Sequence, residues 1–182
     1  VEPITQGGSG LCIYNGGDLY IRNHTNFTVS GFMSGTPGPG EQGQGGCSGI
    51  YIDSDKNVND NYTKITGQIV VSNNSTLTAT ECYHNGITAN PVNITVKGSS
   101  TIKTCDNNTD ESDGKGGLGC YFGKLTVADS SSVVSTGNTA WGFGIFVQDL
   151  DVDGTSKIVA SNNGSFYHYG EPWNFDNWDG TG

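Results

Sequence analysis

An internal repeat constrains the fold of this chain more than any other feature of its sequence. Five segments of twelve residues align without gaps, among them LYIRNHTNFTVS and IVVSNNSTLTAT. Each has apolar residues at its first, third and ninth positions, with a polar bend between two stretches of alternating polarity. Alternation of period two predicts two short β-strands in each segment. The segments begin at Leu19, Ile69, Ile94, Leu125 and Leu150.

A third strand, opened by a glycine, is expected before each segment. Short apolar stretches follow Gly10, Gly49, Gly86, Gly119 and Gly144. Three short strands joined by bends make one triangular coil, and the closest segments start 25 residues apart, which sets the minimal coil length. A single coil cannot bury its apolar row, whereas coils stacked about 4.8 Å apart bury it and pair the backbone groups. The repeat therefore predicts an all-β rod of about five stacked coils.

The predicted fold is a right-handed parallel β-helix, a β-solenoid, over residues 1–164, with three short strands per coil and loop insertions. Its hand follows from the general bias of parallel crossover connections. Asparagines recur at one offset after the third strand, and we expect their amides to form a hydrogen-bonded ladder inside the stack. These are Asn107, Asn138 and Asn163. Three long insertions, at residues 31–46, 53–66 and 106–117, are expected to form loops.

The five segments resemble the repeats of right-handed parallel β-helix proteins of the pectin-lyase-like kind, especially those of bacterial adhesin-like surface proteins. The resemblance covers roughly residues 10 to 164. It implies the fold and leaves the function open, because such a scaffold carries lyases, hydrolases, adhesins and ice-binding proteins alike.

The composition favours an extracellular setting and excludes several kinds of partner. The 182-residue chain holds 29 glycines and many Ser, Thr and Asn residues, which suit turns and short strands better than helices. Its net charge is −10 and its one arginine is Arg22, so it lacks the basic stripe that nucleic acids or anionic membranes need. No apolar run reaches transmembrane length, and the five cysteines match no zinc or redox spacing. We expect a secreted or cell-surface module, part of a larger surface protein, with no nucleic-acid partner and no membrane insertion.

The repeat pattern ends after residue 164. Residues 165–182 read SFYHYGEPWNFDNWDGTG and contain two tryptophans together with other aromatic side chains. Repeat proteins need an atypical end, so we interpret this segment as an aromatic-rich cap. Two other interpretations are open: an aromatic platform for sugars, and an interface to a further segment of the protein.

A run of oxygen-bearing side chains at alternate positions is the sharpest local motif. Side chains spaced in this way suit a hard cation such as calcium. The run consists of Asp53, Asp55, Asn57 and Asn59. It resembles the start of an EF-hand loop but has Val58 in place of the glycine and Lys64 in place of the glutamate. The alternative interpretation is a solvated acidic loop. A second acidic loop with weaker spacing contains Asp106, Asp110, Glu111 and Asp113.

Three aspartates alternate along the strand predicted for the last segment. Because the intervening apolar residues are expected to face inward, Asp149, Asp151 and Asp153 should project outward together. Alternate strand residues lie about 6.6 Å apart, a separation that suits the two carboxyl groups of an inverting glycosidase. These aspartates are the candidate catalytic residues, and the alternative interpretation is a solvated face without a catalytic role.

Aromatic side chains recur at the outward position of the predicted first strand. Across the five coils this position holds Cys12, Tyr51, Thr88, Tyr121 and Phe146, with Trp141 close by. Stacked aromatic rings can hold sugar rings or a protein partner. The candidate ligand-binding residues are therefore Tyr51, Tyr121, Trp141 and Phe146. The alternative is a structural role, since cross-strand aromatic pairs also stabilise sheets.

The expected function is that of a non-enzymatic, adhesin-like surface module that binds a glycan or a cell-surface protein. No nucleophile–base pair is recognisable in the sequence, and calcium is the one cofactor considered. The alternative is a polysaccharide-degrading enzyme, either a hydrolase or a lyase. The resembled lyases act on acidic sugars with calcium and a basic residue that removes the α-proton. A chain with one arginine and seven lysines is poorly equipped for that chemistry.

Overall fold

The chain is entirely β-structure in the residues that the structure describes. The computed structural model describes residues 10–31, 48–54, 65–82, 85–107, 116–138 and 143–164. These ranges contain thirteen strands and no helix, so the all-β prediction is confirmed. They accordingly contain no helix that could span a membrane. The boundary after residue 164 stays a prediction, because residues 165–182 lie outside the described residues. The strands are β1 (Leu11–Ile13), β2 (Leu19–Ile21), β3 (Asn26–Ser30), β4 (Ile50–Asp53), β5 (Gln68–Val71), β6 (Thr76–Thr80), β7 (Ile87–Asn90), β8 (Asn93–Val96), β9 (Thr101–Cys105), β10 (Gly116–Val127), β11 (Ser132–Thr136), β12 (Phe143–Val152) and β13 (Lys157–Ser161).

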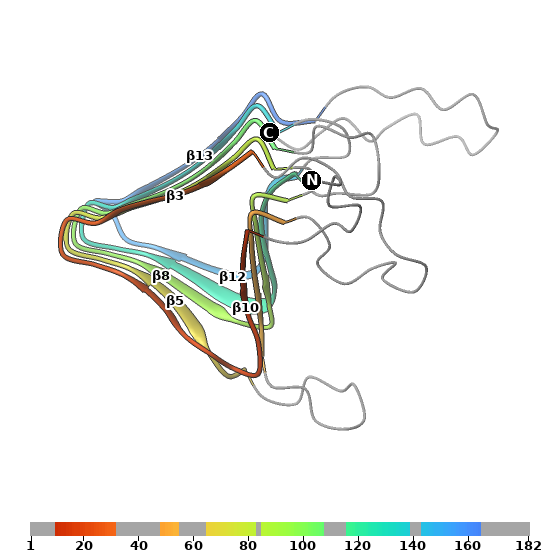
Figure 1. The fold of residues 1–182 in the computed structure, drawn as a ribbon. Coiled ribbons are helices and arrows are strands. Elements are labelled where there is room, and N and C mark those ends of the chain that lie inside the picture. The colour runs from red at the N-terminus through yellow and green to blue at the C-terminus, as the bar shows by residue number, and fades with distance from the viewer. Residues whose placement is uncertain are drawn as a thin grey trace, which may run out of the picture.

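The strands form two sheets in which neighbouring strands run parallel. Sheet A has eight strands in the order β1-β4-β7-β10-β8-β5-β2, with β12 paired to β10. Sheet B has five strands in the order β13-β11-β9-β6-β3. The chain follows a three-sided path in which sheet B forms one side and sheet A folds over the other two (Figure 1). Strands of successive repeats therefore lie side by side, and the predicted parallel pairing is confirmed.

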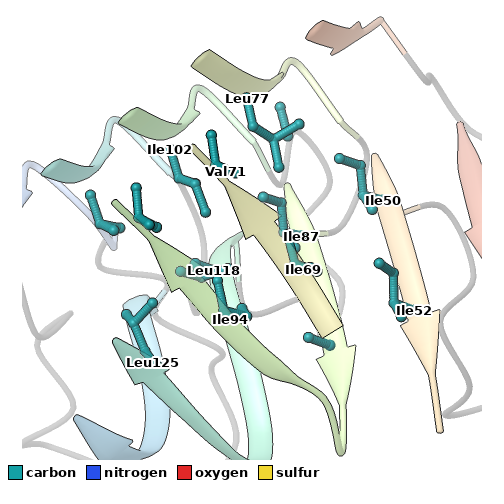
Figure 2. Close-up of a cluster of buried hydrophobic side chains, with 14 of the residues drawn as sticks. Ile50, Ile52, Ile69, Val71, Leu77, Ile87, Ile94, Ile102, Leu118 and Leu125 are labelled. Atoms are coloured by element: carbon teal, nitrogen blue, oxygen red, sulfur yellow. The ribbon is translucent and has the colours of Figure 1, made fainter. Parts of the chain in front are cut away.

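The register places the apolar residues of the five segments in continuous rows. In sheet A the first residues of the segments pair in the predicted order: Leu19, Ile69, Ile94, Leu125 and Leu150. In sheet B a second row consists of Phe27, Leu77, Ile102, Val133 and Ile158. The middle members of both rows are fully buried and gather in the interior (Figure 2). Burying one such Ile or Leu side chain contributes about 1.5–3 kcal/mol, so these rows are the main source of stability.

Sheet A departs from the predicted three short strands per coil. In the first three repeats its two sides are formed by separate strands, whereas β10 and β12 each run through both sides as one long strand. The register of β10 against β12 shifts between Cys120 and Lys124, between the part of β10 that pairs with β7 and the part that pairs with β8. Two sides thereby merge, and the structure has two parallel sheets. The resemblance to pectin-lyase-like, right-handed β-helix repeats is therefore wrong, because the continuous strands leave no separate third sheet.

A ladder of buried asparagines follows sheet B, as predicted from their common offset. Nδ2 of Asn107 donates to Oδ1 of Asn138 at 2.9 Å, and Nδ2 of Asn138 donates to Oδ1 of Asn163 at 2.7 Å. The same two oxygens accept the backbone N–H groups of Asn107 and Asn138, at 3.2 and 3.3 Å. Cys82 occupies the position before Asn107, and its backbone N–H donates to Oδ1 of Asn107 at 3.0 Å. Asn107, Asn138 and Asn163 are the asparagine ladder below, and its prediction is confirmed.

Glycines open the first strands because no side chain fits at these positions. A Cβ on Gly86 would lie 2.7 Å from Nδ2 of Asn107 in the ladder. Three equivalent glycines would also bring a Cβ too close to backbone or side-chain atoms: Gly49, Gly117 and Gly144. The glycine of the fourth repeat is thus Gly117 and not the predicted Gly119, because Leu118 is the residue that pairs with Ile87. The predicted opening of that strand is wrong by two residues.

The bend inside each segment carries a second ladder, which was not predicted from the sequence. The seventh position of the segments is always a hydroxyl residue: Thr25, Ser75, Ser100, Ser131 and Ser156. Each serine hydroxyl accepts the backbone N–H of the equivalent residue in the preceding repeat, at 3.0–3.1 Å. The two residues before it have positive φ in the first four segments, as in Asn73 (58°) and Asn74 (56°), a conformation that Asn tolerates. The bend is therefore fixed in the same way from repeat to repeat, and we call this row the serine ladder.

Candidate functional site

One outer side of sheet A carries two rows of mostly polar side chains. Residues of β2, β5, β8 and the second halves of β10 and β12 alternate between the interior and this surface, as the burial of β5 and β8 illustrates. The register aligns the outward residues Tyr20, Val70, Thr95, Thr126 and Asp151. A second row, two residues earlier, consists of Gln68, Asn93, Lys124 and Asp149. This surface, called the polar face below, is the candidate functional site.

Tyr20 is the aromatic residue of the polar face, and 46% of it is exposed. Its hydroxyl donates to Oδ2 of Asp18 at 2.8 Å and accepts from Nε2 of Gln68 at 2.8 Å. The guanidinium carbon of Arg22 lies 5.6 Å from the ring centroid, within the range of a cation–π contact. The hydrogen bond to Asp18 raises the pKa of the Tyr20 hydroxyl, so this group keeps its proton. Asp18, Tyr20, Arg22 and Gln68 are called the Tyr20 cluster, and their contacts hold the ring in place at the surface.

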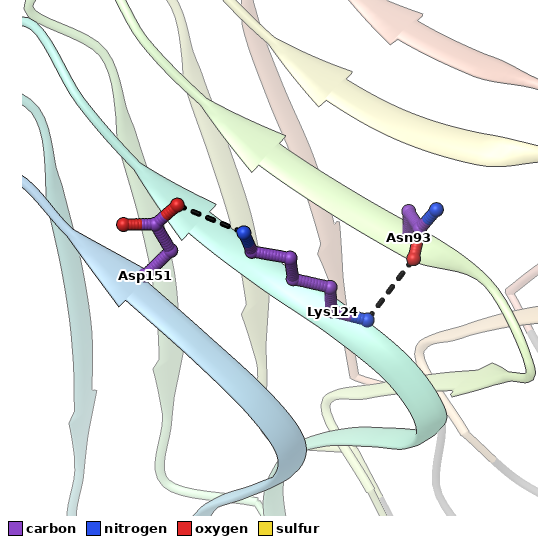
Figure 3. Close-up of polar contacts among 3 residues, drawn as sticks. All are labelled: Asn93, Lys124 and Asp151. Carbon is purple, nitrogen blue, oxygen red and sulfur yellow. Dashed lines mark hydrogen bonds and ion pairs between the residues drawn. The ribbon is translucent and has the colours of Figure 1, made fainter.

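The other end of the polar face carries an ion pair. Nζ of Lys124 lies 2.8 Å from Oδ2 of Asp151, and the backbone N–H of Lys124 donates to Oδ1 of Asn93 at 3.0 Å (Figure 3). Both charged side chains are exposed, by 47% and 59%, so water screens their attraction. A pair of this kind adds at most about 1 kcal/mol of stability. Locally, the pair places the positively charged Lys124 ammonium group against the Asp151 carboxylate.

Asp153 is engaged in the bend that follows β12. Its Oδ2 accepts the backbone N–H of Asp129 at 2.7 Å, and its Oδ1 accepts the N–H and the hydroxyl of Thr155 at 3.0 and 2.9 Å. The bond from Asp129 is the main reason why the pKa of the Asp153 carboxyl lies well below its usual range. A carboxyl that stays ionised cannot supply a proton as a general acid. Asp153 therefore serves to fix the bend.

The three candidate catalytic aspartates are exposed, as their outward position predicts. An inverting glycosidase needs one carboxyl that carries a proton and one that is free to activate water. Asp151 is instead paired with Lys124, and Asp153 is held by three donors. Asp149 lies next to Lys124 in the register of β10 and β12. This geometry favours the alternative interpretation, a solvated polar face.

The predicted row of outward aromatic residues is not continuous. Strand β10 enters that row with Gly119, which pairs with Thr88 on one side and Phe146 on the other. Tyr121 lies two residues further along β10 and does not belong to the row. The prediction of one aligned aromatic row is therefore wrong, and the cause is the choice of Gly119 as the opening glycine.

The exposure of the remaining predicted aromatic residues also differs. Tyr51 is only 5% exposed, and its ring centroid lies 5.6 Å from that of Tyr14, so the expected exposed position of Tyr51 is wrong. Phe146 is partly exposed, at 38%. Trp141 lies outside the described residues. A ligand-binding role of these aromatic residues stays a prediction.

Of the predicted calcium ligands, Asp53 alone falls within the described residues. It is the last residue of β4, pairs in register with Asn90 and is buried. The other three predicted ligands, Asp55, Asn57 and Asn59, lie outside the described residues, as do Asp110, Glu111 and Asp113 of the second acidic loop. Within the described ranges, no three His, Cys, Asp or Glu side chains come together closely enough to hold a metal ion. Calcium binding stays a prediction.

The Tyr20 cluster was not predicted from the sequence, although the sequence contains a signal for it. Tyr20 stands between two inward residues of the first segment, at the position that alternation sends outward. Asp18 lies two residues earlier, directly before the first segment, and Gln68 lies directly before the second segment. Asp151, the outward residue of the last segment, belongs to the same row as Tyr20 at the other end of the polar face.

Comparison with known proteins adds no family to these findings. No protein-family model matches the chain, and neither the curated proteins nor the solved structures contain a match. The chemistry of the surface is therefore the basis for any function.

Proposed function

We propose that this chain is a non-enzymatic module of a larger extracellular surface protein and that it binds a neutral glycan on the polar face. The Tyr20 cluster is the observation that supports this function. It combines an exposed ring with a carboxylate, an amide and a guanidinium group. A sugar ring has an apolar face of C–H groups, which packs on an aromatic ring, and a rim of hydroxyls that such polar groups bind. The net charge of −10 disfavours acidic sugars.

The proposed scaffold for this binding is a stack of about five coils, in which each repeat adds one turn around the interior. Equivalent outward side chains of neighbouring repeats then lie about 4.8 Å apart. The polar face would present its donors and acceptors at this fixed spacing along the stack. A flat and exposed surface buries little of each ligand, so we expect micromolar or weaker binding per module, strengthened by multivalent display on a cell surface.

Glycan-array binding of the purified chain tests this proposal. Removing the ring in Tyr20→Ala should weaken binding about tenfold, the order expected for the loss of one aromatic contact. Tyr20→Phe keeps the ring and should retain most of the affinity. Phe146→Ala is the matched control, because it removes a partly exposed ring on another side of sheet A.

Three results would contradict the proposal. The first is an array without any bound glycan. The second is a loss of binding in Phe146→Ala with none in Tyr20→Ala, which would move the site to the other side of sheet A. The third is release of reducing ends from a polysaccharide, lost in Asp151→Asn, which would favour the hydrolase alternative.

A further inference from the structure

The last described repeat leaves apolar side chains exposed at an open strand edge. Among the described strands, β12 pairs with β10 alone and β13 pairs with β11 alone. Leu150 is 53% exposed and Val152 is 38% exposed, whereas their register partners Leu125 and Val127 are fully buried. The difference comes from position, because Leu150 and Val152 have no described strand on their other side. We call this end of the stack the tail.

The first repeat forms the opposite end, called the head, and its apolar residues match those of the tail. Strands β2 and β3 pair only with β5 and β6 among the described strands. If the stack continued by one repeat beyond the tail, Leu150 would meet a residue like Leu19, and Ile158 a residue like Phe27. Leu19 and Phe27 are both only partly buried. The head therefore offers apolar side chains that can pack against the exposed apolar side chains of the tail.

The serine ladder is open at the same two ends. In the first four repeats the N–H of the ladder residue donates to the hydroxyl of the next repeat. In Ser156, the last member, the N–H instead turns back to the carbonyl oxygen of Asp153 at 3.3 Å. The hydroxyl of Thr25, the first member, donates to the carbonyl oxygen of Arg22 at 2.6 Å, which leaves its oxygen able to accept. A head placed on a tail would bring this N–H and this oxygen together.

The charges at the two ends favour head-to-tail contact over contact between two tails. Continuation of the register would set Asp153 of the tail opposite Arg22, the one arginine of the chain. It would also set Asp149 opposite Asp18, so the apolar row must provide most of the attraction. Two tails in contact would instead bring all three aspartates of β12 and its bend against their own copies. Head-to-tail contact therefore brings less repulsion than contact between two tails.

We propose that the tail of one copy of this chain docks on the head of a second copy, so that both sheets continue across the boundary. The occupant of the exposed edge is thus another molecule of the same chain. Such a contact uses two different surfaces and does not close on itself, so it extends into open chains of copies. The proposal does not depend on the glycan site, which lies on the outer side of sheet A.

Sedimentation velocity on the full chain at increasing concentration tests the proposal. The wild type should pass from monomer through dimer to longer species without stopping at the dimer. Leu150→Lys blocks the tail and Leu19→Lys blocks the head, because a charge on an open edge opposes pairing. Each variant should weaken self-association about tenfold or more. Lysine also lowers the net negative charge, so weaker association cannot come from added repulsion between copies.

Mixing the two variants gives the decisive result. Leu150→Lys keeps an intact head and Leu19→Lys keeps an intact tail, so an equimolar mixture should form a dimer that does not grow. Val134→Lys on β11 is the matched control, because Val134 faces outward from sheet B on a strand that is already paired on both sides, and it should associate like the wild type. If Leu19→Lys unfolds, as judged by circular dichroism, Phe27→Lys replaces it as the head variant.

Three outcomes would overturn the proposal. A wild type that stays monomeric would mean that other parts of the chain cover the ends. A dimer of Leu19→Lys alone would indicate contact between two tails. Equal loss of association in Val134→Lys would place the contact on the outer side of sheet B.

Discussion

The middle member of the asparagine ladder offers the most direct test of how the interior is held together. The Asn138 side chain is hydrogen-bonded through both of its polar atoms. Its Oδ1 accepts the N–H and the Nδ2–H of Asn107. The two hydrogens of its Nδ2 are shared among three acceptors: Oδ1 of Asn163, Oγ of Ser135 and the carbonyl oxygen of Thr104. Asn138 is fully buried, so water cannot replace these partners easily. Asn138→Ala should therefore destabilise the fold strongly.

The expected loss can be worked out from the groups left behind. The buried N–H of Asn107 loses the acceptor that it uses, which costs about 1–3 kcal/mol. Nδ2 of Asn107 keeps a bond to the carbonyl oxygen of Ala79, and Oδ1 of Asn163 keeps the N–H of residue 138. The lost bonds of the Asn138 amide and the small cavity add about 1–2 kcal/mol. The free energy of unfolding should fall by about 2–5 kcal/mol.

Urea unfolding followed by far-ultraviolet circular dichroism measures this change. Asn26→Ala is the control, because Asn26 is exposed on β3, and its effect should stay within about 0.5 kcal/mol. The loss of unfolding free energy in Asn163→Ala should lie between those of Asn138→Ala and Asn26→Ala, because Asn163 is at the end of the ladder, where water can supply a hydrogen-bond partner. Unfolding of Asn138→Ala at the same urea concentration as Asn26→Ala would contradict a stabilising role of the asparagine ladder.

Three further predictions concern the strand opening, the last bend and the cysteines. Gly86→Ala places a methyl group 2.7 Å from Nδ2 of Asn107 and should destabilise the fold by about 1–3 kcal/mol. Gly154 has open space where a Cβ would lie, so Gly154→Ala should leave the stability nearly unchanged in the same urea experiment. The folded-state pKa of Asp153 lies below the unfolded value of about 3.9, so its carboxylate stabilises the fold above that pH. This contribution is lost as the pH falls from there through the folded-state pKa. In acid titration, Asp153→Asn should flatten this part of the curve of stability against pH, and an unchanged curve would contradict the role given to Asp153. Burial raises the pKa of the Cys82 thiol to about 11. When the native chain is alkylated, peptide mapping should therefore find Cys12 modified and Cys82 protected until urea is added. Modification of Cys82 without urea would mean that the interior opens.

The apolar rows could be predicted from the sequence because period-two alternation and a bend of constant length leave one possible register. The pairing of Leu19 with Ile69 and of Ile94 with Leu125 follows directly from the gapless alignment of the segments. The strand before each segment was harder to place from the sequence, because it has only one apolar pair and an opening glycine. In the stretch GGLG three glycines compete for that position, and only the contact with the interior selects Gly117.

The merging of two sides of sheet A has no local signal in the sequence. Strands β10 and β12 continue through a corner where the earlier repeats have separate strands, and this depends on pairing between β10 and β12 along their length. The candidate site was missed for a similar reason. The hydrogen bond between Tyr20 and Gln68 joins residues 48 positions apart, and it arises only when β2 and β5 lie side by side. The serine ladder, in contrast, was readable from the seventh column of the alignment.

The pairing of each repeat with its two neighbours alone determines how the module would respond to a pulling force. The described chain begins at Gly10 beside β1 and ends at Gly164 beside β13, so its two ends belong to opposite outer repeats. Tension between them loads the contact of one outer repeat first, while the inner contacts stay intact. Each detached repeat of 25 residues would add up to about 85 Å of extended chain. The module would therefore lengthen in steps under load, which limits the force that reaches anything attached to it.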